Sequence, residues 1–134
     1  MPTTRTASSR SGRRSKAVAP ATRPAAPAAV PATFASLGVD ADLVADLDAR
    51  GFSAPFPIQT ATLPDTLAGR DVLGRGRTGS GKTLAFALPL VQRLAEEDMA
   101  RAGHPIGLVL APTRELALQI AEVIEPLARV VDMD

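Results

Sequence analysis

The sequence predicts an α/β fold in which a doubly wound parallel sheet is covered by helices. Two short apolar runs, residues 71–74 and 106–110, have the length and composition of buried parallel strands. Segments with helical spacing of apolar residues lie before, between and after these runs. A glycine-rich loop follows the first run and leads into a helical segment, which gives the order strand, loop, helix. The 134 residues have room for one small domain.

Residues 1–32 differ from the rest of the chain in composition and charge. They consist mainly of Ser, Thr, Arg, Ala and Pro, and all their charged side chains are basic. With almost no large apolar side chain, they cannot bury enough surface to offset the entropy of ordering, so we predict a disordered tail. The tail would be a nucleic-acid-binding arm or a solvated leader. An organelle transit peptide is a further alternative, which its prolines disfavour.

Composition also excludes several kinds of site. Cysteine is absent, which excludes disulfides and thiolate metal sites. The single histidine, His104, precedes Pro105 between two periodic segments and is interpreted as an exposed loop residue. No apolar stretch reaches the roughly 20 residues of a membrane-spanning helix, and we expect a cytoplasmic protein.

Four segments are expected to be helical. The first has apolar residues at 37, 39, 43, 44 and 47 and ends near Gly51. The second runs from about 57 to 67 despite Pro64, and the third from about 83 to 97 with a kink at Pro89. The fourth covers about 114–128, and its apolar face consists of Leu116, Ala117, Ile120, Val123, Ile124 and Leu127. Val130 and Val131 then indicate the start of a third strand.

Residues 76–83, Gly-Arg-Thr-Gly-Ser-Gly-Lys-Thr, match the phosphate-binding pattern G-x-x-x-x-G-K-T. The glycines allow the backbone to wrap without Cβ clashes, so that successive N–H groups point at phosphate oxygens. Lys82 would bring its ammonium group to the β and γ phosphates, and the Thr83 hydroxyl would coordinate magnesium. We therefore predict ATP and Mg²⁺ as cofactors, with Lys82 and Thr83 acting on the phosphates.

An overlapping pattern indicates different chemistry. Residues 74–79 also satisfy G-x-G-x-x-G, the dinucleotide pattern, which needs an acidic residue at the end of a second strand about 20 residues later. Glu96, Glu97 and Asp98 lie near that distance, but they close a helical segment that no strand precedes. The triphosphate interpretation is therefore favoured.

Two further segments resemble motifs of one family. Residues 51–59, Gly-Phe-Ser-Ala-Pro-Phe-Pro-Ile-Gln, are similar to the Q motif of the DEAD-box RNA helicases. Phe34 resembles the isolated aromatic residue upstream of that motif, and residues 112–117, Pro-Thr-Arg-Glu-Leu-Ala, resemble motif Ia. With the phosphate loop these segments stand in the family's order, so the resemblance covers residues 34–134.

The resemblance implies that residues 33–134 are the N-terminal part of a RecA-like helicase domain. The full-length protein would couple ATP hydrolysis to RNA binding and local duplex unwinding. Gln59 would pair with the adenine N6 and N7 edge, and Phe34 would stack on the ring; a helix-surface glutamine and a core phenylalanine are the alternatives. The implied nucleotide-binding residues are Phe34, Phe52, Pro57, Gln59, Arg77, Thr78, Gly79, Ser80, Gly81, Lys82, Thr83 and Leu84.

Motif Ia implies RNA as a partner. Pro112, Thr113 and Arg114 would contact the sugar-phosphate backbone, and such contacts carry no base information, so binding would be independent of sequence. Glu115 is interpreted as a helix N-terminal charge rather than a catalytic group.

Some family features differ or are absent. Ser53 and Ala54 replace the polar or charged pair usual in the Q motif, Phe56 replaces a small hydroxyl residue, and Arg77 replaces a frequent glutamine. The sequence contains no Asp-Glu-Ala-Asp or Ser-Ala-Thr motif and no second RecA-like domain. We therefore expect an N-terminal helicase fragment that binds nucleotide without turnover.

Other interpretations stay open. The chain could belong to a different family of ATPases with a phosphate loop, such as a DNA helicase or a transporter subunit. It could also be a non-enzymatic module that binds nucleotide or RNA through its basic tail. Finally, two or three parallel strands would leave exposed edges, so isolated folding should be marginal.

Overall fold

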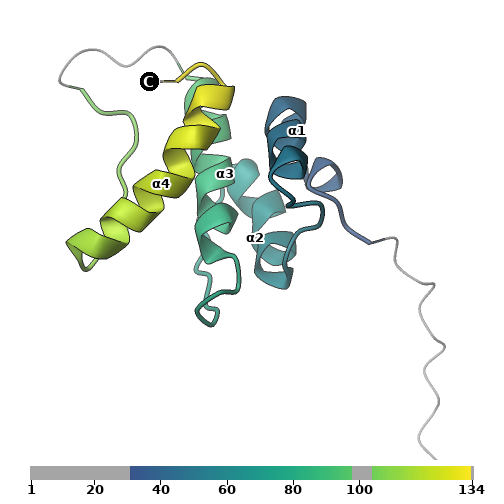
Figure 1. Ribbon diagram of the computed structural model, residues 1–134, viewed down its shortest axis with the longest axis horizontal. Coiled ribbons are helices and arrows are strands. Elements are labelled where there is room, and N and C mark those ends of the chain that lie inside the picture. Colours follow the sequence, from purple (N-terminus) through teal and green to yellow (C-terminus); the bar gives the residue numbers. More distant parts are fainter. Residues whose placement is uncertain (1–30, 98–103, 134) are drawn as a thin grey trace, which may run out of the picture.

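The computed structural model describes residues 31–97 and 104–133, and the elements assigned in them are all helical (Figure 1). They are the 3₁₀-helix η1 (Ala35–Leu37) and the α-helices α1 (Ala41–Ala49), α2 (Pro57–Leu67), α3 (Lys82–Ala95) and α4 (Arg114–Val130). Nearly all of the predicted disordered tail, residues 1–32, lies outside the described residues. Within the described part of the chain, no helix is long and apolar enough to cross a membrane.

The predicted doubly wound parallel sheet is wrong for this structure, because no described residue is assigned to a strand. Residues 71–74 and 106–110, expected as buried strands, run as irregular chain. Their leucines are largely uncovered: the exposed fraction is 98% for Leu73, 78% for Leu108 and 85% for Leu110. The third expected strand is also wrong, since Val130 ends α4 and Val131 caps it.

The physical reason is that a strand cannot bury itself. A parallel strand needs a hydrogen-bonded neighbour for its backbone and helices on both faces for its side chains. Among the described residues neither segment has a ladder partner. The space beside residues 72–74 is instead an open pocket of about 370 Å³ between α2 and α3. Apolar composition alone therefore did not produce a sheet.

The helices bury their apolar stripes against one another. α3 packs between α2 and α4 (Figure 1). α1 also contacts α4, and η1 contacts α2. Burial of aliphatic side chains is the main favourable term in such packing. The core consists of Phe34, Val39, Leu43, Leu47, Leu63, Ala87, Leu88, Val91 and Leu127.

The first expected helix is divided into η1 and α1. The break occurs because Asp40 caps α1, its carboxylate accepting a hydrogen bond from the Asp42 N–H at 2.8 Å. Gly38 reverses the chain just before it with φ 94°, a conformation that favours glycine. The expected stop at Gly51 is confirmed: α1 ends at Ala49 and Gly51 has φ 85°.

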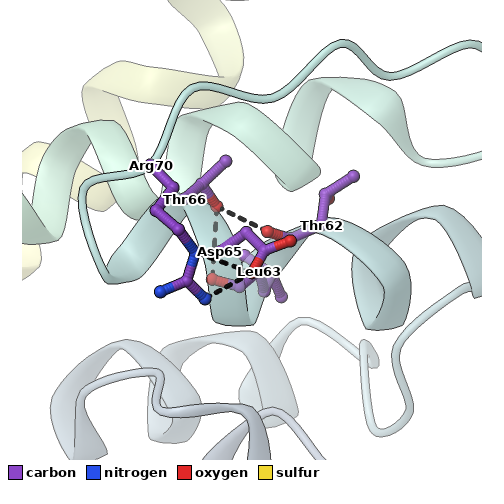
Figure 2. A network of polar contacts seen from close by, with 5 residues as sticks. All are labelled: Thr62, Leu63, Asp65, Thr66 and Arg70. Carbon is purple, nitrogen blue, oxygen red and sulfur yellow. Dashed lines mark hydrogen bonds and ion pairs between the residues drawn. The ribbon is translucent and has the colours of Figure 1, made fainter.

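The second helix is confirmed as α2, which continues through Pro64. Proline has no N–H to donate to the helix ladder. Near this position Thr66 donates its hydroxyl to the carbonyl oxygens of Thr62 and Leu63 at 3.0 and 3.2 Å (Figure 2). At the end of the helix Arg70 donates its Nε to Asp65 Oδ1 at 3.0 Å. These contacts define the exit of the chain from α2 towards the glycine loop.

The third and fourth helices are also confirmed, with small shifts in their ends. α3 contains Pro89 and α4 contains Pro126, and neither helix is interrupted; the kink at Pro89 stays a prediction. On the expected apolar face of α4, Ile120 and Leu127 are buried, whereas Leu116 is 38% exposed. In Figure 1 the N-terminal part of α4 diverges from α3, in agreement with the exposure of Leu116.

Candidate nucleotide-binding site

The glycine loop connects residues 71–74 to α3. Gly79 and Gly81 have φ values of 77° and 81°, which only glycine adopts without strain. Gly81 is the N-cap of α3, so the first turn of that helix, with its free N–H groups, begins directly at the loop. A helix N-terminus beside a glycine loop favours negatively charged groups.

Lys82 closes the loop on itself. Its ammonium group donates hydrogen bonds to the carbonyl oxygens of Gly76 at 2.9 Å and Arg77 at 2.6 Å. These two carbonyls hold the positive charge of Lys82 inside the loop, which the sequence predicts to bind phosphate. Phosphate oxygens would be stronger partners for the ammonium than these neutral carbonyls, because both members of the pair would then be charged.

Ser80 has a buried side-chain oxygen without an internal partner. Its hydroxyl oxygen is buried and has no hydrogen bond, which is a costly arrangement for a polar atom. A Cβ on Gly76 would lie 2.7 Å from this oxygen, so the loop is closely wrapped at this point. The orphaned hydroxyl and the glycine cradle fit the oxygens of a phosphate chain.

Thr83 is the second residue of α3 and is half-buried. In this position its hydroxyl belongs to the same first turn as Lys82. Within the described residues, no group of three His, Cys, Asp or Glu side chains is arranged to hold a metal ion. A magnesium ion would therefore rely on Thr83 and on the phosphates themselves, which suits an ion that retains water and binds substrate oxygens.

Gln59 joins the loop to α2. Its side-chain Oε1 accepts the Phe56 N–H at 2.8 Å, and its Nε2 donates to the Gly81 carbonyl at 3.0 Å. The side chain is only 1% exposed, so Gln59 is not a helix-surface glutamine. A Cβ on Gly81 would lie 2.5 Å from Gln59 Nε2, so glycine is also needed here for close approach. Both polar ends of the amide are therefore engaged within the protein.

Phe34 belongs to the core cluster, against which Leu84 of the predicted site also packs. Its ring is 3% exposed and belongs to the hydrophobic core, which corresponds to the core alternative left open by the sequence. Phe52 is 42% exposed, Pro57 is exposed and Leu84 is half-buried. Stacking of Phe34 on adenine stays a prediction, and it requires the ring to be uncovered.

The predicted RNA-contact residues lie at the start of α4. Thr113 is its N-cap, and its hydroxyl accepts the Leu116 N–H at 3.2 Å. Pro112, Thr113 and Arg114 are all exposed. In Figure 1 the N-terminal ends of α3 and α4 both lie towards the lower side of the molecule.

Two residues that hold the segments around the site were not identified from the sequence. Phe56 contacts the loop closely, since a Cβ on Gly81 would lie 2.6 Å from its Cδ2. Gln92 binds the turn between η1 and α1 through both ends of its amide. The sequence carried a signal for Gln92, because it stands four residues after the buried Leu88 on the apolar stripe of α3.

The chain is similar to known helicases in sequence. A family profile described as "DEAD/DEAH box helicase" matches residues 56–133. "DEAD-box ATP-dependent RNA helicase 3" of Helianthus annuus is 53% identical over 96 residues, which cover 67% of this chain and 41% of that protein. "ATP-dependent RNA helicase DeaD" of Escherichia coli is 54% identical over 90 residues, 67% of this chain and 14% of that protein.

Solved structures agree with the sequence comparison. The RNA helicase Prp28 from Chaetomium thermophilum, solved bound to ADP, has a TM-score of 0.68 and 39% identity, over 74% of this chain and 24% of that one. Dbp5 from S. cerevisiae, solved with RNA and ADP BeF3, has a TM-score of 0.60 and 33% identity, over 73% and 25%. With its glycine loop and buried Gln59, and with the family profile matching more than half of its length, the chain belongs to the DEAD/DEAH box helicase family.

Proposed function

We propose that this chain binds the phosphates of ATP together with Mg²⁺, and that the longer protein couples ATP hydrolysis to RNA binding and duplex unwinding. The observation that carries the proposal is the Lys82 ammonium held inside a glycine cradle that Gln59 joins to α2. The named relatives are ATP-dependent RNA helicases, and the chain spans less than half of their length. The activity of the whole protein is therefore part of the proposal.

Binding would exchange internal hydrogen bonds for bonds to the nucleotide. Lys82 would leave the carbonyls of Gly76 and Arg77 for the β and γ phosphates, and the unpartnered Ser80 hydroxyl would gain an acceptor. Gln59 has acceptor and donor atoms that match the adenine N6 and N7 edge, which GTP does not offer. Thr83 would hold the magnesium ion, which neutralises charge on the phosphates when bound.

The start of α4 would contact RNA. Thr113 and Arg114 are exposed at a helix N-terminus, where backbone N–H groups and a guanidinium suit phosphate oxygens. Dbp5, which is similar to 73% of this chain, was solved with RNA. Contacts of this kind would be independent of base sequence.

Turnover requires groups that the sequence does not contain. Phosphoryl transfer depends on positioned water and on charge neutralisation, and no Asp-Glu-Ala-Asp motif is present in the 134 residues. We expect no ATP hydrolysis above background from this chain alone, measured by phosphate release. Robust turnover that disappears in Lys82→Ala would contradict this expectation.

The decisive test is magnesium-dependent binding of a fluorescent ATP analogue. We expect Lys82→Ala and Gln59→Ala to weaken binding by at least about tenfold, because each removes a buried or charged hydrogen-bonding group. The sequence has only one other lysine, so Lys16→Ala is the matched control for Lys82→Ala. Gln119→Ala is the control for Gln59→Ala. Equal competition by ATP and GTP would contradict adenine recognition by Gln59 but not phosphate binding by the loop. Binding that survives Lys82→Ala would contradict the site.

A further inference from the structure

Gln92 connects two segments that are more than fifty residues apart in sequence. Its Nε2 donates to the Gly38 carbonyl at 3.1 Å, and its Oε1 accepts the Asp40 N–H at 2.9 Å. One amide thus binds the C=O of one residue and the N–H of the residue two positions later. It therefore holds the backbone of the turn between η1 and α1, whatever side chains that turn carries.

The turn forms a unit with Phe34. The carbonyl of Phe34 accepts the N–H groups of Leu37 at 3.1 Å and Val39 at 3.2 Å. Phe34 and Val39 are both buried, with exposed fractions of 3% and 6%. The carbonyl of Gly38 and the N–H of Asp40 both form hydrogen bonds with the side-chain amide of Gln92. Moving Gln92 would therefore move the whole unit from Phe34 to Asp40.

Gln92 and the phosphate loop belong to the same helix. Lys82 begins α3, and Gln92 follows it by ten residues, roughly 15 Å along the axis at about 1.5 Å per residue. At the loop end of α3, Gln59 is bonded to the Gly81 carbonyl. The segment from Phe34 to Gln59 is thus attached to α3 at two points, through the Nε2 of Gln59 at Gly81 and through both ends of the Gln92 amide.

We propose that Gln92 is a positioning residue for adenine recognition. It sets the orientation of residues 34–59, which carry the adenine-binding groups, relative to the phosphate loop on the same helix. It does this through the turn at residues 38–40 and without touching the nucleotide. The inference rests on the proposed function, because it assigns a second determinant to that binding site.

The test separates the base from the phosphates. Gln92→Met keeps the length and helix propensity of the side chain and removes both hydrogen bonds. We expect the Kd for MgATP to rise about 3- to 10-fold, because ordering the released segment against the loop would then cost part of the binding energy. The Kd for magnesium tripolyphosphate, which uses only the phosphate loop, should not change, and the preference for ATP over GTP should fall. Gln119→Met, the same substitution on the exposed face of α4, should leave all three unchanged.

The outcomes distinguish this inference from the proposed function. Weaker binding of MgATP and tripolyphosphate by the same factor would mean that Gln92 only supports the fold, which overturns the inference. Unchanged MgATP binding would overturn it too. A wild-type chain that binds neither ligand overturns the proposed function and the inference with it. If Gln92→Met lacks a cooperative melt, Gln92→Glu replaces it. The carboxylate can accept from Asp40 but cannot donate to Gly38, so the rise in Kd should be smaller.

Discussion

At the scale of the residue, the phosphate loop depends on glycines for two different reasons. Gly79 and Gly81 share a left-handed backbone, but a Cβ at Gly79 would meet nothing within 4 Å. At Gly81 it would lie within 2.6 Å of both Phe56 and Gln59. The first glycine is required by backbone conformation alone, and the second also by the approach of α2.

Comparing Gly79→Ala with Gly81→Ala therefore separates the two reasons. Gly79→Ala should lower the free energy of unfolding by about 1–2 kcal/mol, the cost of a left-handed alanine. Gly81→Ala should lose about 1–3 kcal/mol more, because the added methyl group displaces Gln59. Urea unfolding curves measure both. Equal losses in the two variants would contradict the close contact between Gln59 and the loop.

At the scale of the element, the start of α4 has little packing to support it. Leu116 and Leu118 are 38% and 55% exposed, whereas Ile120 and Leu127, further along the helix, are buried. The N-terminal turn is thus stabilised mainly by its cap, in which the Thr113 hydroxyl accepts the Leu116 N–H.

Removing the cap should loosen α4 where RNA binding is proposed. We expect Thr113→Ala to lower the free energy of unfolding by about 0.5–2 kcal/mol and to reduce helical circular dichroism. Thr113→Ser retains a hydroxyl acceptor and should recover most of the loss. If serine is as unstable as alanine, the methyl group rather than the cap stabilises this end.

At the scale of the whole molecule, the apolar surface is divided between a helical core and two uncovered segments. Leu88 is completely buried between helices, whereas Leu73 and Leu110 are 98% and 85% exposed. Exposed leucines in unpaired chain favour association between molecules.

Leu73→Lys and Leu110→Lys should therefore reduce self-association and change the free energy of unfolding by less than about 0.5 kcal/mol. Leu88→Ala should lower it by about 2–5 kcal/mol, because it creates a cavity. Sedimentation at several concentrations and urea unfolding give the two readouts. If Leu73→Lys destabilises the chain as strongly as Leu88→Ala, residues 71–74 are packed in solution. That result would contradict the finding that they form no strand.

Much of the local structure followed from the sequence. Gly51 predicted where α1 ends, and Pro57 predicted where α2 begins. The apolar spacing predicted α3 and α4 to within a few residues. These features depend on capping, backbone conformation and helical periodicity, which act over a few residues. The glycine loop and its lysine were predicted for the same reason.

What the sequence determined by itself was therefore most of the helix limits, the glycine loop and the family of the protein. The tertiary structure alone decided that residues 71–74 and 106–110 form no sheet, that Phe34 lies in the core, and that Gln92 binds a turn far away in sequence. The physical reason is that strand pairing, burial and long-range amide contacts each need a partner from elsewhere in the chain. A local pattern can indicate that such a partner is needed, but not whether or where the fold supplies it.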